Sequence, residues 1–183
     1  MKYFGIFDER RVCNIELNGR NSILIRILEA NGGRKLPIKN IGDYSAILEL
    51  NIFDYVKNEY EADLEDIFKR LNNFVLENDF DNIIVHCSLG IARSPAIMVY
   101  VAKILGNIEL ENFVKENFRF YNKFIVNAFE KYNYKVKIID DNCFCYGYSN
   151  LNKDNSVDEI IDWECNDFNI GKLAIKKHVL DKK

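Results

Sequence analysis

A cysteine and an arginine flank a short loop in the segment NIIVHCSLGIARSPAIMV, which covers residues 82–99. Cys87 and Arg93 are separated by Ser88, Leu89, Gly90, Ile91 and Ala92. A guanidinium presents a planar set of N–H donors that matches two oxygens of a phosphate group. A thiolate is a strong nucleophile. The pair therefore suits phosphoryl transfer through a covalent phosphocysteine.

The elements on either side of this loop should aim several backbone N–H groups at one point. Residues 83–85 are apolar and predict a buried strand, and residues 96–105 are apolar on nearly every side and predict a central helix. A loop that leads from a strand into a helix can bind an anion with its amides and the helix dipole. Gly90 permits a turn where a side chain would clash. Thiols in such positions ionise more readily than free cysteine, so we expect Cys87 to be the nucleophile.

The segment from His86 to Ser94 resembles the HC-x5-R-[ST] signature of cysteine-dependent protein phosphatases. It is most similar to the compact dual-specificity type and its small phage and bacterial relatives. LELNIFDYV, at 48–56, resembles the strand-then-aspartate segment of that family, and its Asp54 lies 33 residues before Cys87. FRFYNKFIVNAFEKY, at 118–132, resembles the closing helix. The resemblance covers residues 22–132 and implies the α/β fold of a tyrosine phosphatase.

The resemblance also implies a role for each matching residue. Cys87 would attack phosphorus in line, while Arg93 and the amides of residues 88–93 hold the equatorial oxygens. Asp54 would protonate the leaving oxygen and then activate water for the second step. No metal or other cofactor is implied, because the loop and Arg93 neutralise the charge that Mg²⁺ neutralises in other phosphoryl-transfer enzymes.

Two further residues of the motif would support the nucleophile. Ser94 would hydrogen-bond the sulfur and help it leave, although before Pro95 it could simply begin the helix. His86 would hold the loop in shape rather than exchange protons. A buried core histidine would have nearly the same role.

The general acid has two competing candidates, Asp43 and Glu59. Asp43 lies 44 residues before Cys87, which is outside the spacing of the family. Glu59 lies close to the start of a predicted helix. Asp54 is therefore the preferred acid, and its simpler alternative is an acidic residue placed before that helix.

Two features outside the motif remain candidates of lower weight. Arg119 falls where relatives carry another basic residue and could contact substrate. Zinc would need ligands drawn from Cys143, Cys145, Cys165 and His178, whose spacing matches no C-x2-C pattern. We therefore predict no metal site.

The predicted activity is hydrolysis of phosphotyrosine in proteins, with phosphoserine and phosphothreonine as further candidates. The five loop residues include no Lys, His or second Arg. Relatives that act on phosphoinositides or RNA 5′ phosphates tend to carry a basic residue there, so these substrates are the alternative. A non-catalytic phospho-binding module is a second alternative, and sulfur or arsenate chemistry in the same kind of pocket is a third.

The composition limits partners and location. The chain of 183 residues has a net charge of −3 with mixed signs and no basic block, so neither nucleic acid nor an anionic membrane is an expected partner. No apolar run approaches the roughly 18 residues of a transmembrane helix, and the first residues, MKYFGIFDERR, show no signal peptide. Five cysteines without a disulfide pattern favour the cytoplasm. The oligomeric state is left open.

Hydrophobic periodicity predicts an α/β protein with a mixed, largely parallel sheet flanked by helices. Strands are expected at 3–7, 23–28, 46–52 and 83–85, and a weaker one at 136–139. Helices are expected at 64–75, 96–105, 110–118 and 124–132. We predict a catalytic domain over residues 1–135 and a C-terminal extension over 136–183 that packs on it.

Overall fold

The fold is built around one β-sheet. The computed structural model describes residues 2–15, 17, 19–29, 35–53, 61–132, 136–137, 144–151, 158–163 and 175–177. The strand order of the sheet is β3-β2-β4-β1-β5-β6-β7. The strands are β1 (Lys2–Asp8), β2 (Ser22–Leu28), β3 (Ala46–Asn51), β4 (Asn82–Cys87), β5 (Phe144–Leu151), β6 (Asp158–Trp163) and β7 (Ile175–Lys177). The first five are parallel, and β6 and β7 are antiparallel to their neighbours. The predicted mixed, largely parallel sheet is confirmed.

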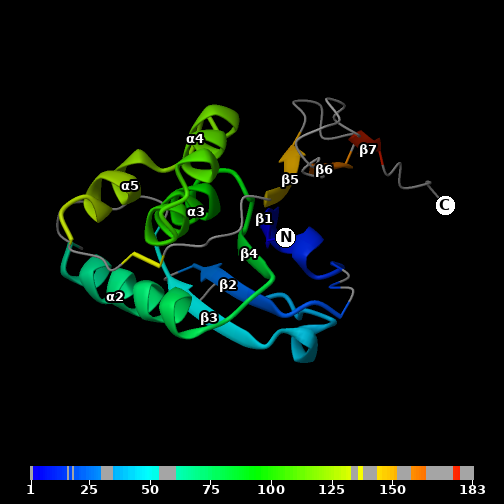
Figure 1. Ribbon diagram of the computed structural model, residues 1–183, viewed down its shortest axis with the longest axis horizontal. Helices are drawn as coiled ribbons and strands as arrows, with labels where there is room; N and C mark the ends of the chain where they lie inside the picture. Colours follow the sequence, from blue (N-terminus) through cyan, green and yellow to red (C-terminus); the bar gives the residue numbers. More distant parts are fainter. Residues whose placement is uncertain are drawn as a thin grey trace.

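Helices cover both faces of this sheet. They are α1 (Glu9–Val12), the 3₁₀ turn η1 (Ile41–Asp43), α2 (Glu61–Glu77), α3 (Arg93–Ile104), α4 (Ile108–Asn117) and α5 (Lys123–Phe129). Figure 1 shows α2, α3, α4 and α5 grouped on one side of the sheet, and the short blue helix α1 on the other. No helix in the described part of the chain is both long enough and apolar enough to cross a membrane.

The two faces of the central strand β4 lead to two separate cores. Ile83, Val85 and Cys87 belong to the large core beneath α2 to α5, whereas Ile84 belongs to a smaller core shared with α1. Successive side chains of a strand point to opposite faces. Consequently Cys87 lies on the face of the four large helices and His86 on the face of α1.

The helix α3 is fixed firmly behind the loop that precedes it. Nearly all of its side chains are buried, as its uniformly apolar sequence predicts. Tyr100 stacks on Phe129 of α5 with ring centroids 4.1 Å apart, and both rings are almost fully buried. Such aromatic pairs add stability beyond their buried area, so α3 is supported by α5.

Parallel strands bring their carboxyl ends to the same edge of the sheet. Cys87, at the end of β4, pairs in register with Asp8, at the end of β1. The end of β2 at Leu28 and the end of β3 at Asn51 meet at the same edge. Open parallel sheets commonly bind ligands outside these carboxyl ends.

The C-terminal strands were not predicted from the sequence. β5 pairs with β1, and β6 and β7 continue the sheet beyond it. The strand predicted at 136–139 is absent at residues 136–137, and its remainder lies outside the described residues. The domain boundary at residue 135 stays a prediction.

Candidate active site

The loop from Ser88 to Ala92 joins the end of β4 to the start of α3, as predicted. Cys87 is only 2% exposed at the base of the loop. The backbone N–H of Gly90 donates to its Sγ at 3.2 Å, and the Ser94 Oγ lies 3.2 Å from the same sulfur. Both groups can donate a hydrogen bond to a thiolate, and hydrogen bonds to a charged acceptor are stronger than neutral ones.

Gly90 is required at its position for two reasons. Its φ is +70°, in the left-handed region that side chains other than glycine rarely adopt. A Cβ at Gly90 would also lie 2.8 Å from the backbone nitrogen of Asp8 and 2.9 Å from the carbonyl carbon of Phe7. The loop therefore packs directly against the end of β1.

The amino end of α3 has no competing side-chain cap. The N-cap residue Ala92 provides no hydrogen bond to the first turn, and that turn contains no acidic residue. The first N–H groups of a helix need partners from outside it. An anion in the loop would supply them and would be favoured by the helix dipole.

Arg93 is almost fully buried, and its guanidinium links three segments at the edge of the sheet. Nη1 donates to the carbonyl of Ile52 at 3.0 Å and, at a longer 3.5 Å, to that of Leu28. Nη2 donates to the Ser88 Oγ at 3.3 Å and forms an ion pair with Glu29. The fork is therefore held in place at the mouth of the loop that contains Cys87.

Glu29 is a site residue that the sequence analysis missed. Its carboxylate accepts hydrogen bonds from Arg93 and, at 3.0 Å, from the Ser88 hydroxyl. Burial works to raise its pKa, but the hydrogen bonds from Arg93 and Ser88 and the charge of Arg93 outweigh this and lower it. Glu29 directly follows the strand predicted at 23–28, and the rule for carboxyl ends of parallel strands could have identified it.

His86 lies on the opposite face of β4 and is 1% exposed. Burial and, second, the positive charge of Arg26 lower its pKa from 6.5 to about 4. The ring is therefore neutral at physiological pH. A neutral, buried imidazole fits the predicted role as a support of the loop rather than as an acid or base.

The preferred acid, Asp54, and its competitor Glu59 lie outside the described residues. The chain leading to Asp54 is described as far as Phe53, and Ile52 binds Arg93 through its carbonyl. The other competitor, Asp43, precedes β3, where Ser45 donates to the first residue of β2 at 2.9 Å. This is the amino-terminal edge of the sheet, and Cys87 is at the carboxyl-terminal edge.

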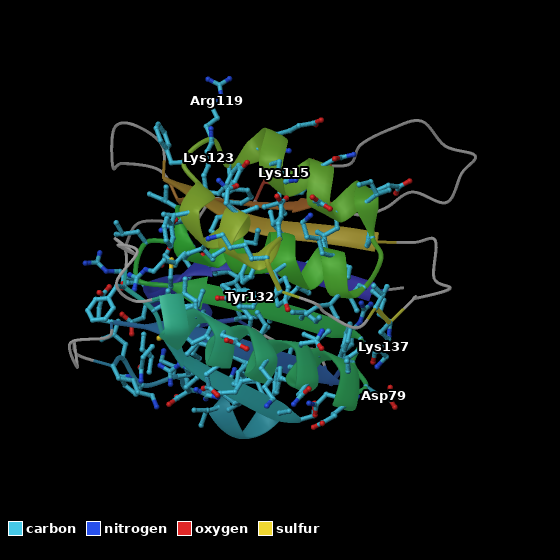
Figure 2. The ribbon with its side chains drawn as sticks, turned by 90° about the vertical axis from the view of Figure 1, so that its left-hand side faces the viewer. Asp79, Lys115, Arg119, Lys123, Tyr132 and Lys137 are labelled. Carbon is cyan, nitrogen blue, oxygen red and sulfur yellow. The ribbon has the colours of Figure 1, made fainter. Side chains whose placement is uncertain are left out.

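Arg119 lies in the turn between α4 and α5. The backbone of that turn is tied to the loop, because the Asn122 N–H donates to the carbonyl of Ala92 at 3.0 Å. Figure 2 shows the Arg119 side chain pointing outward, away from the body of the molecule. A direct contact of Arg119 with substrate stays a prediction.

The residues considered as zinc ligands all lie in the C-terminal part of the chain. Cys143, Cys165 and His178 lie outside the described residues, and Cys145 is described only by the backbone of β5. Among the side chains that the structure does place, no group of three or more His, Cys, Asp or Glu residues could hold a metal ion.

Comparisons with known proteins gave similarity in structure only. Neither a protein-family model nor a curated protein matches the sequence. Human DUSP28 has a TM-score of 0.48 and 13% identity over 70% of this chain and 94% of its own. A mouse putative dual specificity phosphatase complexed with zinc tungstate has 0.47 and 14% over 68% and 77%. Tk-PTP in the active form has 0.44 and 15% over 72% and 90%. With TM-scores below 0.5, these likenesses add nothing to the argument from the site itself.

Proposed function

We propose that this chain is a cysteine-dependent protein phosphatase that hydrolyses phosphotyrosine, with phosphoserine and phosphothreonine as further substrates. The observation that carries the proposal is one arrangement of four groups. The Cys87 sulfur lies at the base of a loop whose Gly90 N–H points at it, next to the Ser94 hydroxyl. The buried Arg93 fork begins the helix at the other end of that loop.

The first chemical step forms a phosphocysteine. The Cys87 thiolate attacks phosphorus, the S–P bond forms and the P–O bond to the leaving group breaks. Asp54 gives its proton to the leaving oxygen, and Arg93 with the loop amides stabilises the charge on the three equatorial oxygens. No electron is gained or lost overall, and no co-reactant is needed.

The second step returns the enzyme to its starting state. A water oxygen attacks phosphorus, Asp54 takes the proton of that water, and the S–P bond breaks to release inorganic phosphate. The departing sulfur carries the electron pair as a thiolate. Ser94, 3.2 Å from the sulfur, is placed to stabilise that charge with its hydroxyl.

The composition of the loop supports a phosphoprotein over a more highly charged substrate. Its side chains between Cys87 and Arg93 are uncharged, and that of Leu89 is 60% exposed at the mouth of the site. The exposed apolar side chain of Leu89 suits the ring of a phosphotyrosine better than an inositol polyphosphate or an RNA triphosphate. The predicted cytoplasmic location agrees with this class of substrate.

Turnover by the purified chain on a panel of substrates tests the proposal. The panel contains phosphotyrosine, phosphoserine and phosphothreonine peptides, phosphoinositide vesicles and 5′-triphosphorylated RNA, each assayed with and without a metal chelator. We expect the phosphotyrosine peptide to be hydrolysed fastest and the chelator to have no effect. Turnover confined to the lipid or RNA substrates would favour the alternative activity, and binding without turnover would indicate a phospho-binding module.

A further inference from the structure

A buried arginine lies on the opposite side of the sheet from the nucleophile. Arg26 of β2 is 1% exposed, and its Cα pairs in register with that of His86 on β4. Burying a cation is costly unless charge and hydrogen bonds compensate for the lost water. The contacts of Arg26 should therefore explain why the strand contains it.

Two of its contacts involve the Nη1 and Nη2 atoms of the guanidinium, and one of them balances its charge. Nη1 lies 3.2 Å from the carboxylate of Glu49 on β3, which also pairs with Lys35. Nη2 donates to the carbonyl of Leu36 at 3.0 Å. Neither contact involves the candidate active site.

The third contact leads to the active-site loop. The Nε–H of Arg26 donates to Nε2 of His86 at 3.2 Å, and both side chains are buried. This bond does not balance the charge of Arg26, because a neutral imidazole is its acceptor. The hydrogen bond therefore acts on His86 rather than on the charge of Arg26.

An arginine can only donate, so Nε2 of His86 must carry a lone pair. The proton of the neutral ring is then on Nδ1. The hydrogen bond from Arg26 also sets the orientation of the ring. Nδ1 is buried and makes no hydrogen bond of normal geometry. The ring belongs to the residue directly before Cys87 in β4, and Asp8 of β1 and Glu49 of β3 are the nearby acidic groups.

We propose that Arg26 is a positioning residue for the active-site loop. Its Nε–H fixes His86 as the Nδ1–H tautomer in one orientation, and His86 in turn holds the backbone at Cys87. The catalytic part of this proposal rests on the proposed phosphatase function, whereas the tautomer and orientation of His86 do not depend on it. Misplacement of a reacting group by about 1 Å can cost roughly 100-fold in rate, so a support of this kind affects turnover without contacting substrate.

The tautomer can be measured directly because the chain contains only two histidines, His86 and His178. Nitrogen NMR of ¹⁵N-histidine-labelled protein, with His178→Gln used for assignment, separates the two tautomers and the charged ring. We expect His86 in the wild type to show the neutral Nδ1–H pattern between pH 7.5 and 5.5. In Arg26→Met this pattern should give way to a tautomer mixture, and Arg26→Lys, which keeps a donor, should retain more of it.

Arg70→Met is the matched control. Arg70 of α2 is an exposed arginine whose Nη2 donates to the backbone carbonyl of Glu49 at 3.0 Å. It therefore contacts the same strand as Arg26 but not His86. We expect its His86 spectrum and its turnover to match the wild type.

The catalytic readout is kcat on the phosphotyrosine peptide, measured on variants whose circular dichroism shows a folded chain. We expect Arg26→Met to lose roughly 10- to 100-fold in kcat, with part of the loss restored in Arg26→Lys. An Nε2–H tautomer in the wild type, or an unchanged His86 spectrum in folded Arg26→Met, would overturn the proposal. If Arg26→Met does not fold, the wild-type and Arg26→Lys spectra decide the matter. If the wild type hydrolyses no phosphate ester, the proposed function fails, and the tautomer measurement still decides the contact between Arg26 and His86.

Discussion

At the scale of single residues, the guanidinium of Arg93 donates to several different acceptors. Two backbone carbonyls hold Nη1, and the Glu29 carboxylate and the Ser88 hydroxyl accept from Nη2. A bound phosphate would use the same Nη2 group. In the proposed phosphatase, Glu29 would therefore compete with the substrate anion for Arg93. The sequence motif alone does not show this competition.

Glu29→Gln should bind inorganic phosphate or tungstate more tightly than the wild type. The carboxylate of Glu29 is 44% exposed, so water and salt screen its pairing with Arg93. An exposed ion pair contributes roughly 0.2–1 kcal/mol, which corresponds to a gain of up to about fivefold in affinity. Calorimetric titration checks this at low salt, with Glu116→Gln, an exposed acid on α4, as the control. Weaker binding by Glu29→Gln would instead make Glu29 a support that orders Arg93.

At the scale of elements, the loop depends on how closely it packs against the end of β1. Gly90 meets the backbone of Phe7 and Asp8, so this contact joins two elements that are far apart in the sequence. Backbone atoms cannot move aside as a flexible side chain can. The loop geometry is therefore determined by the sheet as much as by the motif.

Gly90→Ala should lower both stability and activity. Gly19→Ala separates the cost of a positive φ from the cost of close packing against β1. Both glycines have positive φ, +70° and +69°, but a Cβ at Gly19 would meet no atom within 4 Å. Gly19→Ala should cost only the roughly 1–2 kcal/mol of the left-handed backbone. Gly90→Ala should cost clearly more in urea unfolding and should abolish turnover. Equal losses in the two variants would contradict the close packing of the loop on β1.

We predict that the general acid is Asp54, which follows β3 in the sequence, and leaving-group dependence tests this prediction. Asp54→Asn should lose roughly 10²–10⁴-fold on phosphotyrosine peptide, because the leaving oxygen must be protonated as the P–O bond breaks. The loss should be clearly smaller for an aryl phosphate whose leaving group has a low pKa. Steady-state kinetics on both substrates provides the measurement.

Asp43→Asn is the matched control for this experiment. Asp43 is an exposed aspartate at the amino-terminal edge of the sheet, away from Cys87. It should show no leaving-group dependence. If the two variants behave alike, or if only Asp43→Asn depends on the leaving group, the connection after β3 does not supply the acid.

Local patterns predicted the elements around the site, and long-range pairing explains what they missed. The alternation in residues 46–52 and the stripe in residues 64–75 are local signals, and both correspond to elements of the structure. Glu29 and Arg26 were overlooked because their partners, Arg93 and His86, lie 64 and 60 residues away. Only the pairing of β2 with β4 brings them together.

At the scale of the whole molecule, a neutral buried histidine makes stability depend on pH. The pKa of His86 is lowered from 6.5 to about 4, first by burial and then by the charge of Arg26. Between these values the unfolded chain binds a proton at this residue and the folded chain does not. Stability therefore rises with pH across this window and is lost as pH falls from about 6.5 towards 4.

Urea unfolding at pH 7, 5.5 and 4.5 should show this dependence. The difference between 6.5 and about 4 in the pKa of His86 corresponds to an order of 3 kcal/mol at about 1.4 kcal/mol per pH unit. His86→Gln should be less stable at pH 7 but should lose less of its stability on acidification. Other groups titrate in both proteins, so the difference between them isolates His86. Equal pH dependence in the two would show that this histidine is not kept neutral by the fold.

Hydrolysis of phosphotyrosine peptide by Cys87→Ser is the most direct test of the proposed function, because both chemical steps depend on that sulfur being the nucleophile. The hydroxyl stays protonated, so turnover should fall by roughly a thousandfold or more, while tungstate binding persists because Arg93 and the loop remain. Cys13→Ser is the control: Cys13 donates to the carbonyl of Glu9 at 3.0 Å and should be dispensable. Turnover by Cys87→Ser above a few per cent of wild type would exclude the phosphocysteine mechanism.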